Sequence, residues 1–203
     1  MVFFDRAAPE RLSTFSDGVF AVLITVLVLE LRPPEHETFV SLLTLWPTGL
    51  SYAVSYLFIA IVWVNHHHVM RYATEAAPRV IWFNFAHLFS VSLLPLSTAW
   101  MAVSRLAPQP VAFYAGVFFL VNVTYVFLLW ELVDADASDA LSLRLRRNMR
   151  VRSIATLCVF AVAAIVALAQ PVIGLVLCCL CLIGYLRPEA PGSQTASAPP
   201  ERR

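Results

Sequence analysis

Long apolar runs constrain this chain more than any other feature of its sequence. Six of them cover residues 12–31, 39–64, 80–103, 108–132, 154–169 and 172–186, and about 20 apolar residues in a helix cross a bilayer. Hydrophobic residues make up 60% of the 203 positions and charged residues 13%, against about 25% charged residues in soluble domains. We therefore predict an all-α polytopic membrane protein with six transmembrane helices in residues 1–186.

Prolines and a Pro/Gly break mark where these helices bend or end. Pro47 lies inside the second run and predicts either a kink or a short preceding helix, and Pro95 lies inside the third. The sequence AQPVIG at 169–174 separates the last two runs and predicts a tight hairpin. The segment 187–203 is rich in Pro, Ser and Ala, which predicts a disordered cytoplasmic tail.

The arginines predict the orientation in the membrane. With the N-terminus in the cytoplasm, twelve of the 14 basic residues lie inside: Arg6, Arg11, Arg71, Arg79, Arg144, Arg146, Arg147, Arg150, Arg152, Arg187, Arg202 and Arg203. Only Arg32 and Arg105 then lie outside. This positive-inside bias predicts a multi-pass cell-membrane protein with both termini cytoplasmic. All basic residues are arginine, a usage typical of GC-rich bacterial genes.

The connector at 131–153 begins acidic and ends basic. A helix there would lie on the membrane surface or in the cytosol, with its arginines near the lipid headgroups. The alternative is a solvated connector that only carries the positive-inside charge.

The first run contains an aspartate that an anchor alone would not need. Inside hydrocarbon, Asp17 would cost about 2.5–3.5 kcal/mol at a helix centre. On a helical wheel, the residues within about 60° of Val22 form a stripe: Phe15, Gly18, Val19, Thr25, Val26 and Leu29. The positions at about 140° or more from Val22 are Asp17, Phe20, Ile24, Leu27 and Leu31. Asp17 and the stripe therefore face different environments.

A second polar cluster, WVNHHH at 63–68, ends the second run. Three consecutive histidines span about 200° of a helix, so they cannot converge on one ion, and we predict no metal site. They either lie at the membrane interface or include one that bonds a carboxylate. Asn84 and His87 lie near the same inner end of the third run, where a buried Asp17 would need polar partners.

Other function classes lack their signatures. Catalytic motifs such as G-x-S-x-G, H-E-x-x-H, the P-loop and the dinucleotide fingerprint are absent from the sequence, so an enzyme is not expected. The net charge of +1 gives no indication of nucleic-acid binding. The potassium-channel filter sequence TVGYG is also absent. No cofactor is expected.

The first run resembles the first-helix signature of the transmembrane protein 175 family of potassium channels. The matching residues are Arg11, the sequence Phe15-Ser16-Asp17, Gly18, Thr25 and Glu30. WVNHHH at 63–68 and SLLPLSTA at 92–99 match more weakly and in the same order. The six-run layout agrees with the family, so the resemblance covers most of residues 11–186.

The resemblance implies a channel for potassium ions in the lipid bilayer, of a leak type that lacks the usual filter. With one Phe-Ser-Asp repeat it implies a homotetramer whose central pore is lined by the first helix. The positions that match the family's apolar constriction are Val22, Val26 and Leu29, and Thr25 matches its selectivity layer. The residues that match its structural polar network are Arg11, Phe15, Ser16, Asp17, His66 or His67, and Asn84.

Two functional hypotheses follow from the sequence. The first is a potassium-selective leak channel gated by apolar rings on the first helix. The alternative is a proton-coupled membrane transporter that uses Asp17 and the cluster His66–His68 as a relay. A flux that needs a proton gradient would distinguish the second from the first.

Overall fold

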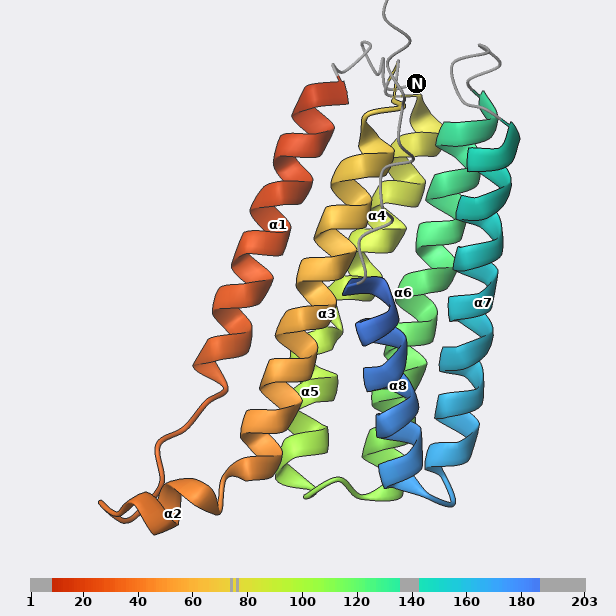
Figure 1. Ribbon diagram of the computed structural model, residues 1–203. Helices are drawn as coiled ribbons and strands as arrows, with labels where there is room; N and C mark the ends of the chain where they lie inside the picture. Colours follow the sequence, from red (N-terminus) through yellow and green to blue (C-terminus); the bar gives the residue numbers. More distant parts are fainter. Residues whose placement is uncertain (1–8, 74, 76, 136–142, 187–203) are drawn as a thin grey trace, which may run out of the picture.

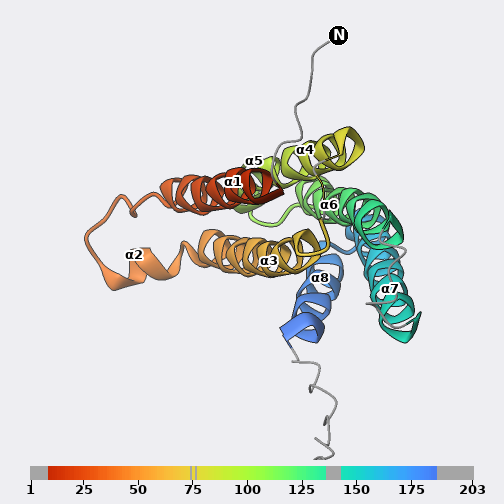
Figure 2. The same cartoon turned by 90° about the horizontal axis from the view of Figure 1, so that it is seen from above.

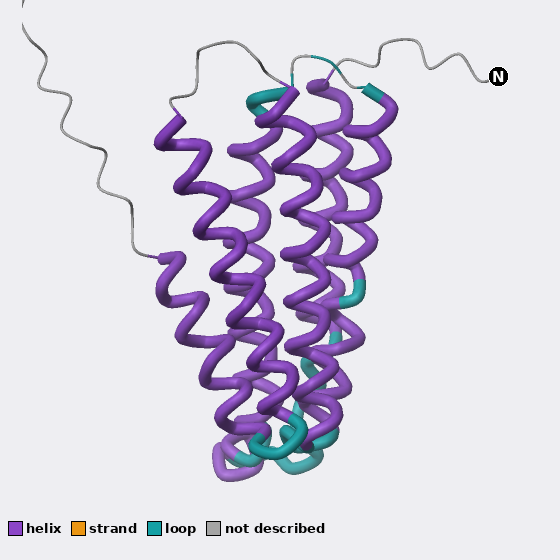
Figure 3. Tube along the Cα trace, turned by 90° about the vertical axis from the view of Figure 1, so that its right-hand side faces the viewer, coloured by secondary structure: helices purple, strands orange, loops and turns teal. Residues whose placement is uncertain are grey.

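The computed structural model describes residues 9–73, 75, 77–135 and 143–186. Its helices are α1 (Pro9–Leu29), α2 (Phe39–Leu43), α3 (Trp46–Met70), α4 (Pro78–Ser92), α5 (Leu94–Val103), α6 (Pro108–Ala135), α7 (Leu143–Ala167) and α8 (Pro171–Leu186). The long helices run up and down in one bundle (Figure 1). Their connections gather at the two ends of the bundle (Figure 3).

The predicted membrane spans correspond to these helices. Five stretches of the described chain are long and apolar enough to cross a membrane: Pro9–Leu29, Trp46–Met70, Pro78–Val103, Pro108–Leu132 and Arg147–Ala167. The prediction of an all-α polytopic membrane protein is thus confirmed. The sixth predicted span corresponds to α8, which has only 16 residues, about 24 Å of helix, and ends part-way along the bundle (Figure 1). The count of six spans stays a prediction.

Both prolines lie in the first turn of a helix. Pro47 lies in the first turn of α3, where its missing N–H has no helical partner to lose, and the short helix α2 precedes it. Pro95 opens α5 directly after α4 ends at Ser92. The backbone of Leu93 bonds the Ser90 carbonyl instead of continuing the α-helical pattern, so the third span is a broken helix.

The arginine-rich end of the 131–153 connector does not form a separate element. From Leu143 onwards it is the start of α7, which continues into the membrane span to Ala167. The span predicted at 154–169 therefore begins earlier. A helix lying along the membrane surface is wrong for this part, because residues 143–153 continue directly into the span, whereas a cytosolic start of the helix stays a prediction. Residues 136–142 of the connector and the predicted tail at 187–203 lie outside the described residues.

The core forms around α6, which packs against α3, α4, α5, α7 and α8. Its Phe118 stacks on Phe58 of α3 with ring centroids 3.6 Å apart, and Phe160 of α7 meets both rings. Seen from above, α1 lies at the edge of the bundle, beside α3 and the α4–α5 pair (Figure 2). One face of α1 is thus left without a neighbour in this single chain.

The hairpin between α7 and α8 is as tight as predicted, because glycine allows it. A Cβ at Gly174 would lie 2.6 Å from the Cβ of Ala167 and 2.8 Å from the carbonyl oxygen of Ala163. Such distances are too short for any side chain, so only glycine permits α8 to approach α7 this closely.

The tryptophans mark two levels along the bundle. Trp46 and Trp100 lie at the end where α3 begins and α5 ends, and Trp63, Trp82 and Trp130 lie toward the opposite end. All five are exposed. Trp46 and Trp63 are 17 positions apart on α3, about 25 Å of helix, which is close to the thickness of a hydrocarbon core. Exposed tryptophans at two such levels are typical of the aromatic belts of membrane proteins.

Candidate functional site: the two faces of α1

The first helix has one buried face and one exposed face. Its buried residues are Leu12, Ser16, Phe20, Leu23 and Leu27, spaced three or four positions apart as one helical face requires. They pack against α3, α4 and α5. This arrangement follows from the sequence, because the bulky apolar residues lie on one side of the helix and the small and branched ones on the other.

The exposed face carries every position predicted to line a pore. Val22 is 59% exposed and Leu29 is 77% exposed, and Thr25 and Val26 lie beside them. Gly18, one turn earlier, is exposed as well. The Thr25 hydroxyl donates a hydrogen bond of 2.7 Å to the carbonyl of Val22. Its proton is thereby committed to the helix, and the hydroxyl oxygen still has a lone pair to offer outward.

The buried face of α1 carries a polar network that joins three helices. Ser16, His66 and Asn84 are fully buried. The Asn84 amide donates to the Ser16 hydroxyl oxygen at 3.0 Å, and the Asn84 carbonyl oxygen lies 2.7 Å from His66 Nε2. Because that oxygen can only accept, Nε2 carries the proton. One amide thus links α1, α3 and α4.

A second histidine extends this network toward α6. The ring of His87 lies parallel to that of His66, with centroids 5.8 Å apart, and its Nδ1 lies 3.1 Å from the Thr124 hydroxyl. Within the described part of the chain, His66 Nδ1 and His87 Nε2 are buried without a hydrogen-bond partner. The polar cluster therefore extends from α1 to α6 in the half of the bundle where α1 begins and α3 ends.

Asp17 is bonded to tryptophan. The Trp63 indole Nε1–H donates to Asp17 Oδ1 at 2.8 Å, and Asp17 itself is half-buried. The expected histidine partners lie elsewhere: His66 bonds Asn84, and the ring of His67 lies against Trp63 with centroids 5.7 Å apart. The carboxylate therefore holds α1 to α3 from the side of the helix that faces away from the stripe.

The remaining predicted positions lie at the margin of this network. His67 Nε2 lies 3.4 Å from the Arg71 guanidinium, and His68 is exposed, with its Nδ1 near the Val64 carbonyl. Arg11 is exposed, and Phe15 packs edge-on against Phe85. Among the residues that the structure describes, no three His, Cys, Asp or Glu side chains are placed to hold a metal ion.

Two contributors to the network were not among the predicted site residues. Trp63 opens the WVNHHH sequence and lies three positions before His66, so helical spacing places both on neighbouring parts of one face. That spacing could have indicated Trp63 as the donor to Asp17. Thr124 has no such signal, because nothing in the sequence relates α6 to α4.

Comparison with known proteins places these features in one family. A family model described as "Endosomal/lysosomal potassium channel TMEM175" matches residues 11–95, which hold α1 from Arg11 onwards, Trp63, His66 and Asn84. A potassium channel of Chryseobacterium sp. (strain P1-3) is 38% identical over 118 residues, which are 58% of this chain and 62% of that protein. A potassium channel of Chamaesiphon minutus is 34% identical over 141 residues, which are 65% of this chain and 70% of that protein.

The fold agrees with the sequence similarity. The crystal structure of a lysosomal potassium-selective channel TMEM175 homolog from Chamaesiphon minutus superimposes with a TM-score of 0.78 at 27% identity. The match covers 87% of this chain and 95% of that one. Motif, similarity along the chain and fold therefore agree, and the resemblance seen in the first helix is confirmed: this chain belongs to the TMEM175 family.

Proposed function

We propose that this chain is a potassium channel of the cell membrane. Its relatives carry the names of potassium channels, and its family is one of ion channels and not of enzymes. The single observation that carries the proposal beyond the names is the exposed stripe of α1. Gly18, Val22, Thr25, Val26 and Leu29 lie uncovered on a helix whose opposite face packs against α3, α4 and α5.

The proposed assembly is a homotetramer with four copies of α1 around a central axis. One chain leaves the stripe without a neighbour, and fourfold symmetry would bring the four stripes together. Small and branched side chains suit that position, because they let helices approach an axis closely. Both termini are placed in the cytoplasm on the strength of the arginine distribution.

The proposed pore is narrowed by apolar rings. Rings of Val22, Val26 and Leu29 would exclude water and gate conduction by dewetting. Thr25 stands between Val22 and Val26, and its hydroxyl proton is bonded to the Val22 carbonyl. A ring of four such oxygens would present lone pairs to a partly dehydrated cation. Potassium is the permeant ion, and the mechanism requires no cofactor.

The transporter alternative is less well supported by the geometry. Asp17 is bonded to the Trp63 indole, and His66 to Asn84. Both groups lie off the exposed stripe. Their contacts join helices, which is the role expected of a brace and not of an ion-binding relay open to water.

Flux measurements on the purified full chain in liposomes test this proposal. With a potassium gradient and no pH gradient, we expect potassium efflux from liposomes that contain the protein. Once a potassium ionophore is added, liposomes with and without the protein should release potassium equally. Val22→Asn should raise the leak by wetting the constriction, whereas Leu180→Asn on the exposed part of α8 should not. Flux that appears only with a proton gradient would establish the transporter instead.

The assembly is tested by mass in the same preparation. A homotetramer has about four times the 22.6 kDa mass of the chain, which native mass spectrometry resolves from a dimer. A dimer or monomer that still conducts potassium would overturn the fourfold arrangement of α1.

A further inference from the structure

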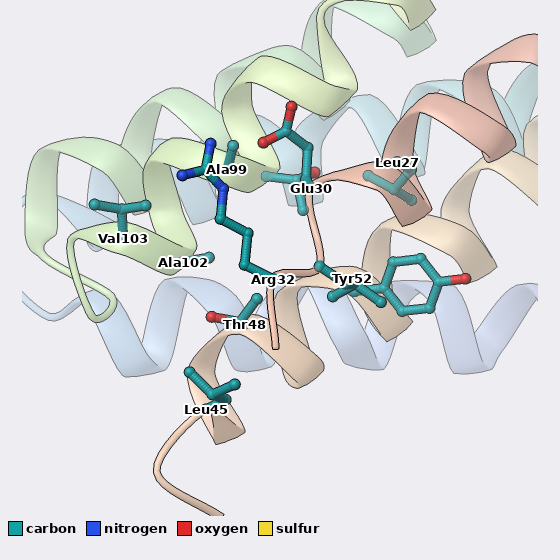
Figure 4. Close-up of a pocket in the computed structure, with 11 residues that line it drawn as sticks. Leu27, Glu30, Arg32, Leu45, Thr48, Tyr52, Ala99, Ala102 and Val103 are labelled. Atoms are coloured by element: carbon teal, nitrogen blue, oxygen red, sulfur yellow. The ribbon is translucent and has the colours of Figure 1, made fainter. Parts of the chain in front are cut away.

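A cavity at the end of the bundle where α1 ends has no part in the proposed pore. It lies between the end of α1, the start of α3 and the second half of α5, and has a volume of about 290 Å³. The residues that decide its chemistry are Leu27, Glu30, Arg32, Thr48, Tyr52 and Ala99. Figure 4 shows this site, with Glu30, Arg32 and Ala99 on one side and Thr48 and Leu45 on the other.

Two opposite charges stand together on one wall of the cavity. Glu30 and Arg32 lie two positions apart just after α1, and the Arg32 guanidinium ends beside Ala99 of α5 with Glu30 close by in the same view (Figure 4). Among the residues that the structure describes, neither side chain forms an ion pair or a hydrogen bond, with the other or with any third group. Both residues are exposed, and together they present an acceptor and a set of donors at the rim of the cavity, which is the complement of a zwitterion.

The exposed residues around the cavity indicate its depth in a bilayer. Trp100 on α5 and Trp46 at the start of α3 are both exposed, as belongs to the level of lipid headgroups. The neighbouring helix α2 presents Phe39 and Leu43 with 87% and 73% of their surface exposed. An apolar five-residue helix so exposed fits an interface between lipid and water better than bulk water. The mouth of the cavity therefore opens among headgroups.

The inner wall of the cavity is mostly apolar, with Thr98 of α5 as its buried polar residue. Leu27 is almost completely buried, and Ala99 and Ala102 of α5 form the opposite side. Thr48 and Tyr52 line the α3 side, and the Tyr52 hydroxyl points away from the charged pair (Figure 4). A ligand that fills this space has a charged head near Glu30 and Arg32 and a short apolar part beneath it.

We propose that this cavity binds the headgroup of an aminophospholipid. Arg32 would bond the phosphate, Glu30 the primary ammonium, and the first methylenes of the acyl chains would lie against Leu27 and Ala99. The same head chemistry occurs in soluble phosphoethanolamine, but the apolar wall and the position among headgroups favour the lipid. The proposal goes beyond ion conduction and does not depend on it.

Lipid binding to the full-length protein, measured by native mass spectrometry in detergent, tests the assignment. The probes are phosphatidylethanolamine, phosphatidylglycerol and soluble phosphoethanolamine. We expect one phosphatidylethanolamine per chain, retained at about tenfold lower lipid concentration than phosphatidylglycerol, because hydrogen bonds between charged groups are the strong ones. Soluble phosphoethanolamine should bind far more weakly.

Matched variants locate the site. Glu30→Gln and Arg32→Gln should each weaken phosphatidylethanolamine binding about tenfold, whereas Arg105→Gln, also exposed near this end but outside the cavity, should not. Ala99→Phe should abolish binding by filling the space with both charges intact. Unchanged thermal unfolding of each variant shows that it is folded.

Three outcomes would overturn the proposal. Equal retention of phosphatidylethanolamine by the parent chain and by both charge variants would mean that the lipid binds outside this cavity. If phosphatidylglycerol bound with the same affinity as phosphatidylethanolamine, Glu30 would not recognise the ammonium group. Soluble phosphoethanolamine that binds as tightly as the lipid would make the site one for a small zwitterion. None of these results depends on potassium flux, so the channel proposal stands or falls separately.

Discussion

Asn84 joins α1 to α3 from its position on α4. Its amide donates to Ser16 and its carbonyl faces the Nε2–H of His66. Asn84→Ala would leave that N–H buried without an acceptor, at a cost of about 1–3 kcal/mol. We expect a loss of that size in the free energy of unfolding in mixed micelles. The control is Asn122→Ala, whose amide donates to the Phe118 carbonyl of its own helix and should cost less. Equal losses of unfolding free energy in both variants would show that Asn84 does not link the three helices.

Asp17 should matter more for assembly than for permeation. Asp17→Ala removes the acceptor of the Trp63 indole and loosens α1 from α3, so we expect less tetramer in detergent and a lower melting temperature. Asp17→Asn keeps an acceptor oxygen and should be milder. Trp63→Phe should reproduce the effect of Asp17→Ala, and the double variant should cost little more than either. Normal assembly without flux would instead point to a direct ionic role for Asp17.

At this scale the sequence predicts which residues are polar and buried, but not all their partners. Ser16, His66 and Asn84 could be named from their position near one end of three helices, and the structure brings them together. The partner of Asp17 was expected to be a histidine. Trp63 takes that place because the rotation of α3 directs His66 into the core, and such rotations depend on packing that one sequence does not specify.

The stripe of α1 can be tested along the whole helix. In a background with Cys158, Cys178, Cys179 and Cys181 changed to Ser, single cysteines at positions 22, 25, 26 and 29 should react with a small thiol-reactive cation and block flux. Cysteines at 20 and 27 should not, because Phe20 and Leu27 are buried against neighbouring helices. Reactivity should fall toward Val22 from either end, since apolar rings exclude water. Uniform reactivity around α1 would defeat the pore assignment.

The hairpin of α7 and α8 gives a separate prediction about stability. Gly174→Ala places a methyl group 2.6 Å from Ala167, and such overpacking costs about 1–3 kcal/mol. Gly184→Ala on the same helix meets nothing within 4 Å and should be neutral or slightly stabilising, because alanine has the higher helix propensity. Thermal unfolding of the two variants side by side makes the comparison; equal melting temperatures would mean that α7 and α8 separate readily.

Helix positions were predictable where apolar runs are long and prolines are few. Pro47 and Pro95 gave the places where helices begin or break, but not whether Pro47 would kink a helix or follow a short one. The start of α7 was placed too late because its first turns are rich in arginine. Hydropathy cannot show that a polar segment continues the helix of the apolar segment after it.

At the scale of the whole molecule, the arginine distribution predicts a membrane topology that thiol labelling can test. Glu37→Cys and Gln109→Cys, both at exposed positions on the side with few arginines, should be labelled in intact cells by a membrane-impermeant thiol reagent. Ala77→Cys, exposed at the opposite end, should be labelled only after the cells are opened. Labelling of Ala77→Cys in intact cells would reverse the orientation.

The assembly is the part of the molecule that neither one sequence nor one chain can specify. The helical wheel of α1 separates a packed face from an uncovered one. In the structure Val22, Thr25, Val26 and Leu29 are exposed, as the wheel predicts for the uncovered face. The number of copies that cover this face depends on the angle between neighbouring chains. That angle is a property of the interface, so it has to be measured.

The bonds between α1 and its neighbours also have an order in time. Trp63 follows Asp17 by 46 residues and Asn84 follows Ser16 by 68. At about 5–20 residues per second, a ribosome makes the first partner roughly 2–9 s after Asp17 and the second roughly 3–14 s after Ser16. During that interval α1 leaves the ribosome with its polar end unmatched. Because this end lies at the start of the helix, the nascent chain can keep it at the aqueous surface until α3 and α4 arrive.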